Sequence, residues 1–148
     1  MRLLDADAAP LSLPLDRPPD AIVPVPLHPI RRRERGFDQA ELLAAALAEA
    51  TRIAVRPGLL LRTRYTDPQI GLRPHERREN VKGAFELRHP LPGSGVRVLL
   101  VDDVYTTGAT LEECAGTLRK GGAGAVYALT VTRAAPAWHP ATDLGDDL

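Results

Sequence analysis

The stretch that most constrains the fold is "VRVLLVDDVYTTGAT", residues 96–110. Its centre, Val98–Val101, is continuously apolar, without the alternation of a strand that has one face in water. A strand buried on both faces is typical of parallel sheets that are covered by helices. We therefore expect Val98–Val101 to lie in a central strand with a parallel neighbour on each side.

The segments around this stretch alternate between strand-like and helix-like patterns. Apolar segments 21–28, 53–63 and 125–133 favour extended structure, and one further strand is expected between Lys82 and the central strand. A helix should begin near Asp38, which has Glu41 at capping-box spacing, and a second at Thr110, paired in the same way with Glu113. Alternating strands and helices indicate an α/β fold with a twisted, mostly parallel sheet flanked by helices.

The remaining segments suggest how the chain is organised. Residues 1–20 are rich in proline and aspartate and are expected to form an N-terminal arm or the remnant of a lost module. One domain should cover residues 21–135, followed by a tail at 136–148. Within the domain, residues 64–81 are polar and poorly periodic, so we expect a long functional loop there.

Composition excludes several classes of protein. A single cysteine, Cys114, allows no internal disulfide and no cysteine-based zinc site, so no zinc is expected. The formal net charge is zero, which argues against a polycation made for nucleic acid. No signal-peptide pattern and no apolar run long enough to span a bilayer are present, so we expect a cytoplasmic protein without membrane contact.

The residues at the end of the central strand are the strongest candidates for a ligand-binding site. Asp102 and Asp103 come at its carboxyl end, where open α/β sheets bind ligands, and they could share one ligand only if the strand breaks there. The next residues are small or hydroxyl-bearing, and with the start of a helix they suit a phosphate: Thr106, Thr107, Gly108, Ala109 and Thr110. Phosphate beside acids that accept from hydroxyls points to a ribose 5-phosphate.

Two other interpretations of the acid pair make different demands on the sequence. A Walker B pair would need a G-x-x-x-x-G-K-[ST] motif, which this sequence lacks. A solvated turn without function is the simpler alternative, and the hydroxyl-rich loop at this spacing argues against it.

The motif resembles the phosphoribosyl-diphosphate (PRPP) motif of type I phosphoribosyltransferases. "VPVPLH", "RRRERGFDQAELLA" and "QIGLRPHERRENVKGAF" precede it in the order seen in the ComF family, which is associated with competence. The resemblance covers about residues 21–133 and implies the type I phosphoribosyltransferase fold. The cysteine-rich N-terminal zinc module that is usual in this family has no counterpart here.

The resemblance also implies roles for individual residues. Asp102 and Asp103 would bind the ribose hydroxyls, and residues 106–110 the 5-phosphate. The turn Pro26–Pro29, through Leu27 and His28, would bind the diphosphate, with Mg²⁺ carried in by the substrate. Segment 64–81 would be the flexible catalytic loop, and its cations would neutralise the leaving pyrophosphate: Arg73, Arg77, Arg78 and Lys82. Whether Arg31–Arg35 contact the diphosphate or form a basic patch stays open.

Two functions of different classes follow. In the first, the protein binds PRPP and transfers its phosphoribosyl group to an unidentified nitrogen acceptor, in connection with natural competence. In the second, it is a non-catalytic accessory of DNA uptake that binds single-stranded DNA or a helicase partner through Arg31–Arg35. Aromatic residues make up only 4% of the chain, which counts mildly against base stacking. A homo-oligomer is compatible with either function.

Overall fold

The computed structural model describes residues 2–5, 17–66, 73–91 and 93–133 of the chain. Its strands are β1 (Arg2–Asp5), β2 (Ala21–Pro24), β3 (Leu60–Arg62), β4 (Phe85–Leu87), β5 (Val96–Tyr105) and β6 (Ala123–Arg133). Its helices are α1 (Pro29–Arg35), α2 (Gln39–Thr51), α3 (Pro74–Val81) and α4 (Ala109–Lys120).

The main sheet has the order β1-β6-β5-β2, and every neighbouring pair in it is parallel. Val98 on β5 lies between Ala21 on β2 and Val126 on β6. The prediction of a central strand with two parallel neighbours is therefore confirmed. β3 and β4 form a separate antiparallel pair.

Part of the N-terminal segment joins this sheet. Residues 2–5 form β1, which runs parallel to β6 and pairs Arg2 with Tyr127. The remainder of the expected arm up to residue 16 lies outside the described residues, as does the tail after Arg133.

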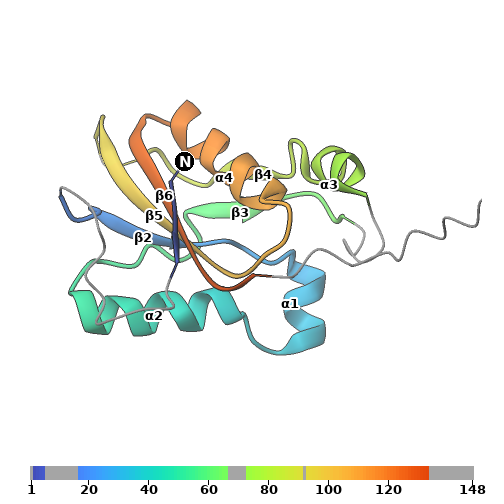
Figure 1. The fold of residues 1–148 in the computed structure, drawn as a ribbon, viewed down its shortest axis with the longest axis horizontal. Coiled ribbons are helices and arrows are strands. Elements are labelled where there is room, and N and C mark those ends of the chain that lie inside the picture. Colours follow the sequence, from blue (N-terminus) through green and yellow to red (C-terminus); the bar gives the residue numbers. More distant parts are fainter. Residues whose placement is uncertain (1, 6–16, 67–72, 92, 134–148) are drawn as a thin grey trace, which may run out of the picture.

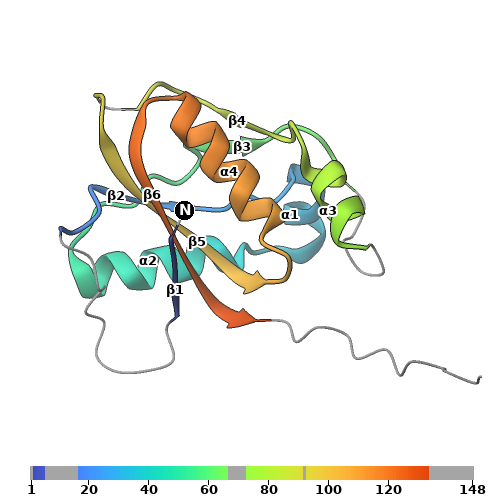
Figure 2. The same ribbon diagram turned by 45° about the horizontal axis from the view of Figure 1, so that its top comes forward.

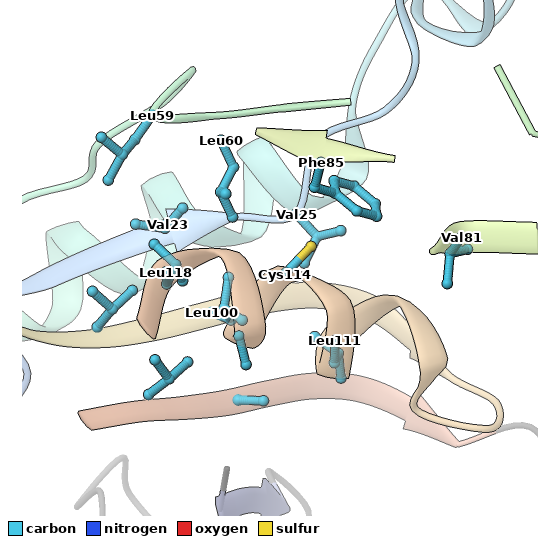
Figure 3. Packing of buried hydrophobic residues seen from close by; sticks show 14 of the residues in the cluster. Val23, Val25, Leu59, Leu60, Val81, Phe85, Leu100, Leu111, Cys114 and Leu118 are labelled. Carbon is cyan, nitrogen blue, oxygen red and sulfur yellow. The ribbon is translucent and has the colours of Figure 1, made fainter. Parts of the chain in front are cut away.

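Helices cover both faces of the sheet, with α2 on one side and α4 on the other (Figures 1 and 2). Successive strand residues point to opposite faces, so Leu99 and Leu100 serve different layers. Leu99 packs with Ile22 and with Ala44 of α2. Leu100 belongs to the larger cluster, which includes α4 and the β3–β4 pair (Figure 3).

The apolar face expected for α4 is confirmed, because Leu111, Cys114, Ala115 and Leu118 are all buried. Cys114 is completely inaccessible to solvent. None of the described helices is long and apolar enough to cross a bilayer.

The two predicted capping boxes turn out differently. Asp38 is the N-cap of α2, as expected, but the carboxylate of Glu41 does not fold back onto it and instead binds Arg32. The box at Thr110 is wrong, because α4 begins at Ala109 with Gly108 as its N-cap. Glu113 accepts a hydrogen bond from the backbone N–H of Gly83 instead, at 2.7 Å.

Two short helices were not expected. α1 occupies the basic segment after Pro29 and has no buried residue, and α3 lies inside the predicted loop 64–81. Both have proline in the first turn, where its missing N–H costs nothing. Neither has the apolar periodicity that reveals a helix in a sequence, because both lie on the surface. Residues 67–72 of the predicted loop lie outside the described residues.

Candidate functional site

A cleft of about 310 Å³ opens at the carboxyl ends of β2 and β5. Its walls come from the turn after β2, from α1, from the first turn of α2, from β3 and the residues that follow it, and from the loop between β5 and α4. The polar residues that line it are His28, Arg31, Arg35, Asp38, Gln39, Arg62, Thr66, Asp102, Asp103, Tyr105, Thr106 and Thr110.

The cleft gathers about half of the predicted site. The predicted residues that line it are Leu27, His28, Asp102, Asp103, Thr106, Gly108 and Thr110. The predicted residues that do not line it are Arg73, Arg77, Arg78, Lys82, Thr107 and Ala109. Ala109, the first residue of α4, is buried in the core, and its N–H donates to the Thr107 hydroxyl at 3.5 Å.

The two acids reach the same cleft although the strand does not break at them, which corrects the expectation from the sequence. β5 continues to Tyr105, and its pairing with β6 extends to the same residue. Pairing with β2 ends earlier, where the Val25 N–H donates to the Val101 carbonyl at 2.9 Å. The sheet therefore opens on the β2 side only, and Asp102 and Asp103 line the space that this opening leaves.

Burial raises the pKa of the Asp102 carboxyl to about 8, and a hydrogen bond with the Asp103 side chain and the charge of Asp103 add to the effect. The charge of Asp38 acts in the same direction. A hydrogen bond of 2.9 Å from the Asp103 backbone N–H to Asp102 opposes it. In the free protein at neutral pH, Asp102 is therefore mostly protonated.

The turn before α4 has the backbone that close approach of an anion requires. Gly108 has φ 79°, in the left-handed region. A Cβ atom at this position would lie 3.0 Å from the Tyr105 hydroxyl oxygen, so the Tyr105 side chain would have to shift by a few tenths of an ångström. The first turn of α4 follows directly, and the positive end of the helix dipole favours negative charge there.

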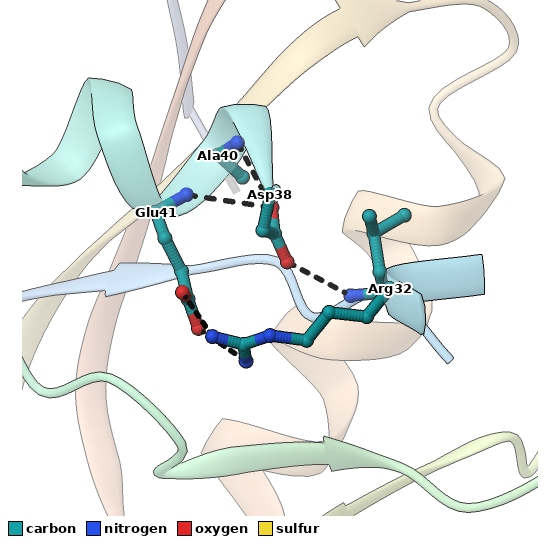
Figure 4. Close-up of polar contacts among 5 residues, drawn as sticks. Arg32, Asp38, Ala40 and Glu41 are labelled. Carbon is teal, nitrogen blue, oxygen red and sulfur yellow. Dashed lines mark hydrogen bonds and ion pairs between the residues drawn. The ribbon is translucent and has the colours of Figure 1, made fainter. Parts of the chain in front are cut away.

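The turn after β2 is already engaged with protein groups. The Leu27 N–H, expected to serve a ligand, donates to Asp38 at 3.3 Å (Figure 4). The His28 imidazole is the N-cap of α1 and accepts from the Ile30 N–H at 3.3 Å. The same ring meets Tyr65 edge-on, with 5.2 Å between the ring centroids.

Arg62 is the main residue that the sequence reasoning missed. It lines the cleft, its guanidinium donates to the Thr66 hydroxyl, and it lies 5.4 Å from the centre of the Phe85 ring. Its Nε is buried and has no hydrogen-bond partner among the residues that the structure describes. Burial lowers its pKa, and negative charge on Asp102 or Cys114 would oppose this shift. The only signal in the sequence was one arginine directly after the apolar run "GLLL".

The arginines of α1 divide into different environments. Arg31 and Arg35 line the cleft, and Arg31 also lies 5.9 Å from the centre of the Tyr65 ring. Arg32 instead forms a bidentate pair with Glu41, and Arg33 is exposed. Two of the four arginines thus lie at the cleft, one is paired with an acid and one is exposed.

The cations of the predicted catalytic loop lie on and beside α3, which packs against α4. Arg78 is 3.7 Å from Glu112 of α4, and Lys82 is 3.9 Å from Glu79. The Arg64 guanidinium caps the end of α3 by donating to the carbonyls of Asn80 and Lys82, at 3.0 and 2.6 Å. In this arrangement the α3 cations stand outside the cleft.

The described residues do not form a metal site of their own. Among the described residues, no three histidine, cysteine, aspartate or glutamate side chains gather as a metal-binding group. The cleft does contain the carboxyl groups of Asp102 and Asp103, whose oxygens are the ligand type that Mg²⁺ prefers. These residues fit a Mg²⁺ that reaches the cleft already bound to a phosphorylated ligand.

Comparisons with known proteins agree with the geometry. The chain is 40% identical over 119 residues to "Competence protein F" of Haemophilus influenzae, covering 78% of this chain and 51% of that protein. It is 40% identical over 115 residues to "DNA utilization protein YhgH" of Escherichia coli K12, covering 78% and 50%. It is 34% identical over 113 residues to "Competence protein ComFC" of Bacillus subtilis, covering 76% and 44%. The chain thus spans about half the length of these relatives. No protein-family model matches it.

Solved structures with a similar fold are phosphoribosyltransferases. Adenine phosphoribosyltransferase of Saccharomyces cerevisiae superposes with a TM-score of 0.50 at 18% identity, over 80% of this chain and 58% of the enzyme. A second structure of an adenine phosphoribosyltransferase gives 0.50 at 19% identity, over 80% and 59%. At these identities the likeness establishes the fold, and the predicted fold class is confirmed.

Proposed function

Since this chain is a ComF-like protein with the type I phosphoribosyltransferase fold, we propose that its cleft binds PRPP together with magnesium. The observation that carries the proposal is the position of the acid pair and the Gly108 turn on one continuous piece of chain facing one cleft. A ligand with vicinal hydroxyls next to a phosphate satisfies both features. A phosphate alone would be repelled by the acids.

In this proposal each part of the cleft holds one part of PRPP. Asp102 and Asp103 accept hydrogen bonds from the ribose hydroxyls, and the turn at Gly108 with the first N–H groups of α4 holds the 5-phosphate. The turn 26–29 and Arg31 face the diphosphate. Magnesium bound to the substrate neutralises part of the diphosphate charge.

If the protein is an enzyme, it transfers the phosphoribosyl group to a nitrogen acceptor. The acceptor nitrogen forms a bond to ribose C1 while the bond from C1 to the diphosphate oxygen breaks. Pyrophosphate leaves with the electron pair, and the nitrogen releases its proton. Movement of α3 toward the cleft would bring Arg77 and Arg78 to the leaving group and exclude water from the reacting carbon.

Calorimetry with PRPP and Mg²⁺ tests the binding proposal. Replacing both Asp102 and Asp103 by asparagine keeps their size but removes acceptors for two hydroxyls. A hydrogen bond to a charged group contributes about 1.5–3 kcal/mol and one to a neutral group about 0.5–1.5 kcal/mol. Because Asp102 is mostly protonated in the free protein, we count one bond of each kind, and PRPP affinity should fall by about thirtyfold to a thousandfold. Inorganic phosphate should bind the variant at least as well as the wild type. Equal PRPP affinity in both proteins would show that the acids do not hold the ribose.

A screen of nitrogen heterocycles for release of pyrophosphate tests the enzymatic step. Wild-type protein and the double variant should be assayed side by side. Release that depends on both the acceptor and the acid pair supports transfer. Tight PRPP binding with no release for any acceptor would indicate a sensor or scaffold of PRPP.

Single-stranded DNA is a second candidate ligand, favoured by one surface. Arg33 and Arg35 of α1 are exposed, and Phe37 next to them is 52% exposed. Cations beside an exposed aromatic ring suit a phosphate backbone and a stacked base. Names of the relatives refer to competence and DNA utilization, which agrees with such a role. Binding of an oligonucleotide should weaken with salt and when Arg33 and Arg35 become glutamine. Binding that is indifferent to both would refute this role.

A further inference from the structure

Asp38 occupies an unusual position between two walls of the cleft. Its side chain lines the cleft, and the residue is only 5% exposed. Its Oδ1 accepts from the N–H groups of Ala40 and Glu41, at 3.0 and 3.4 Å, and its Oδ2 accepts from the Leu27 N–H at 3.3 Å (Figure 4). One carboxylate therefore joins the first turn of α2 to the turn after β2.

Capping of α2 alone does not account for an acid at this position. Serine and asparagine cap helices about as well as aspartate, and they carry no charge. Asp38 is buried near Asp102 and raises the pKa of that residue through its charge. A carboxylate has two acceptor oxygens, whereas serine has one oxygen and asparagine replaces the second oxygen with a donor. The feature that requires aspartate is the bond to Leu27.

That bond determines which donors the turn can offer to a ligand. Pro26 and Pro29 have no N–H, and the Ile30 N–H is taken by the His28 ring. The Leu27 backbone N–H is bound to Asp38. The backbone N–H of His28 has no acceptor among the described residues. Among the described residues, the turn thus has one anchored backbone donor, at Leu27, next to one at His28 that no protein acceptor occupies.

The first turn of α2, which carries Asp38, has contacts on two sides. The Arg32 guanidinium binds both oxygens of Glu41, at 2.9 and 2.7 Å, and so ties α1 to the first turn of α2. Ala44, one turn further along α2, is completely buried against the sheet. A turn held by Asp38 is therefore fixed relative to β5, which carries the acid pair.

We infer that Asp38 is a positioning residue that holds the turn 26–29 in the conformation that receives the diphosphate end of the ligand. This inference rests on the proposed function, because it assumes PRPP as the ligand. It assigns Asp38 to the diphosphate end alone, so the phosphate end at Gly108 should not depend on it.

The test uses Asp38→Ser and Asp38→Asn in the full chain. Both variants retain a cap for α2, and both lose the acceptor for Leu27. Glu34→Gln is the matched control, because Glu34 is an exposed acid on the neighbouring α1 and its loss removes the same charge. Calorimetry with Mg²⁺ is done for PRPP, pyrophosphate and ribose 5-phosphate. The amide resonances of Leu27, Ala40 and Glu41 are followed by NMR.

We expect both variants to bind PRPP and pyrophosphate about tenfold more weakly, the effect of losing one hydrogen bond to a charged group. Ribose 5-phosphate should bind unchanged or more tightly, because a negative charge has gone. The Leu27 resonance should shift more than those of Ala40 and Glu41. The Glu34→Gln protein should behave as the wild type or bind all three ligands slightly better.

Three outcomes separate the hypotheses. If the variants bind all three ligands more tightly, Asp38 acts only through its charge and the inference is wrong. If PRPP affinity is unchanged while the Leu27 resonance shifts, the bond is structural and the inference is also wrong. A wild-type protein that binds neither PRPP nor pyrophosphate would refute the proposed function, and the inference would fall with it.

Discussion

The most direct test of the cleft needs no ligand. Asp102 is an acid whose pKa is raised from 3.8 to about 8 in the folded protein. Between these values the folded state holds a proton that the unfolded state releases. The free energy of unfolding contributed by this residue therefore falls as the pH rises through this window, the reverse of the usual behaviour of a paired carboxylate. Asp102→Asn removes the ionisable group and with it this loss of stability.

The magnitude follows from the same values. One pKa unit corresponds to about 1.4 kcal/mol, and pH 7 lies about three units above 3.8, so the variant could gain at most about 4 kcal/mol there. Water that enters the cleft reduces this figure, and we expect a gain of about 1–3 kcal/mol at pH 7. The gain should grow toward pH 8 and vanish below about pH 4, where both states are protonated.

Urea denaturation between pH 4 and 9 measures this difference, with Asp20→Asn as the control. The pKa of Asp20 is lowered because the carboxylate accepts from the backbone N–H of Arg97, at 2.8 Å, and from its guanidinium. The stability that Asp20 contributes should be present at neutral pH and should be lost as the pH falls below the ordinary pKa of aspartate, 3.8. This pH dependence is opposite in sign to that of Asp102. If the Asp102→Asn protein is as stable as the wild type at every pH, then Asp102 is not desolvated.

Four further predictions concern the rest of the molecule. Amide exchange in α3 should slow when PRPP is added, and equal protection with and without PRPP would rule out a lid. Gly108→Ala should destabilise the fold by about 1–2 kcal/mol, measured by urea denaturation, because the residue would adopt a left-handed φ and meet Tyr105. Arg62→Gln, which keeps a partner for Thr66, should weaken PRPP binding in calorimetry by about tenfold if the buried charge faces the ligand. Elemental analysis should find no stoichiometric zinc, since the chain has a single thiol.

Much of the scaffold was predictable from local sequence. The run Val98–Val101 indicated a strand buried on both faces, and such a strand in an α/β chain is central and parallel. The apolar face of α4 was predictable for a similar reason, since burial repeats with the period of the helix. The turn at Gly108, which we expect to bind phosphate, is made of residues that are adjacent in the chain. Their small and hydroxyl-bearing side chains were therefore enough to predict it.

The short helices were not predictable in this way. α1 and α3 bury little and are rich in charge, so their sequences show no apolar period. Their ends are held by groups that come from other segments: Arg64 caps α3, and Glu41 of α2 binds Arg32 of α1. The predicted box at Thr110 failed for a related reason, because Glu113 pairs with Gly83, thirty residues away.

By itself the sequence determined the central strand, the core helix α4 and the acid pair followed by a small turn, because each depends on neighbours in the chain. Only the tertiary structure brought Arg62 from β3 to the cleft and directed the second oxygen of Asp38 onto Leu27. Those placements depend on how separate segments pair and pack across the sheet. Such contacts cannot be predicted from the local sequence, because burial and hydrogen-bond partners are properties of the folded chain as a whole.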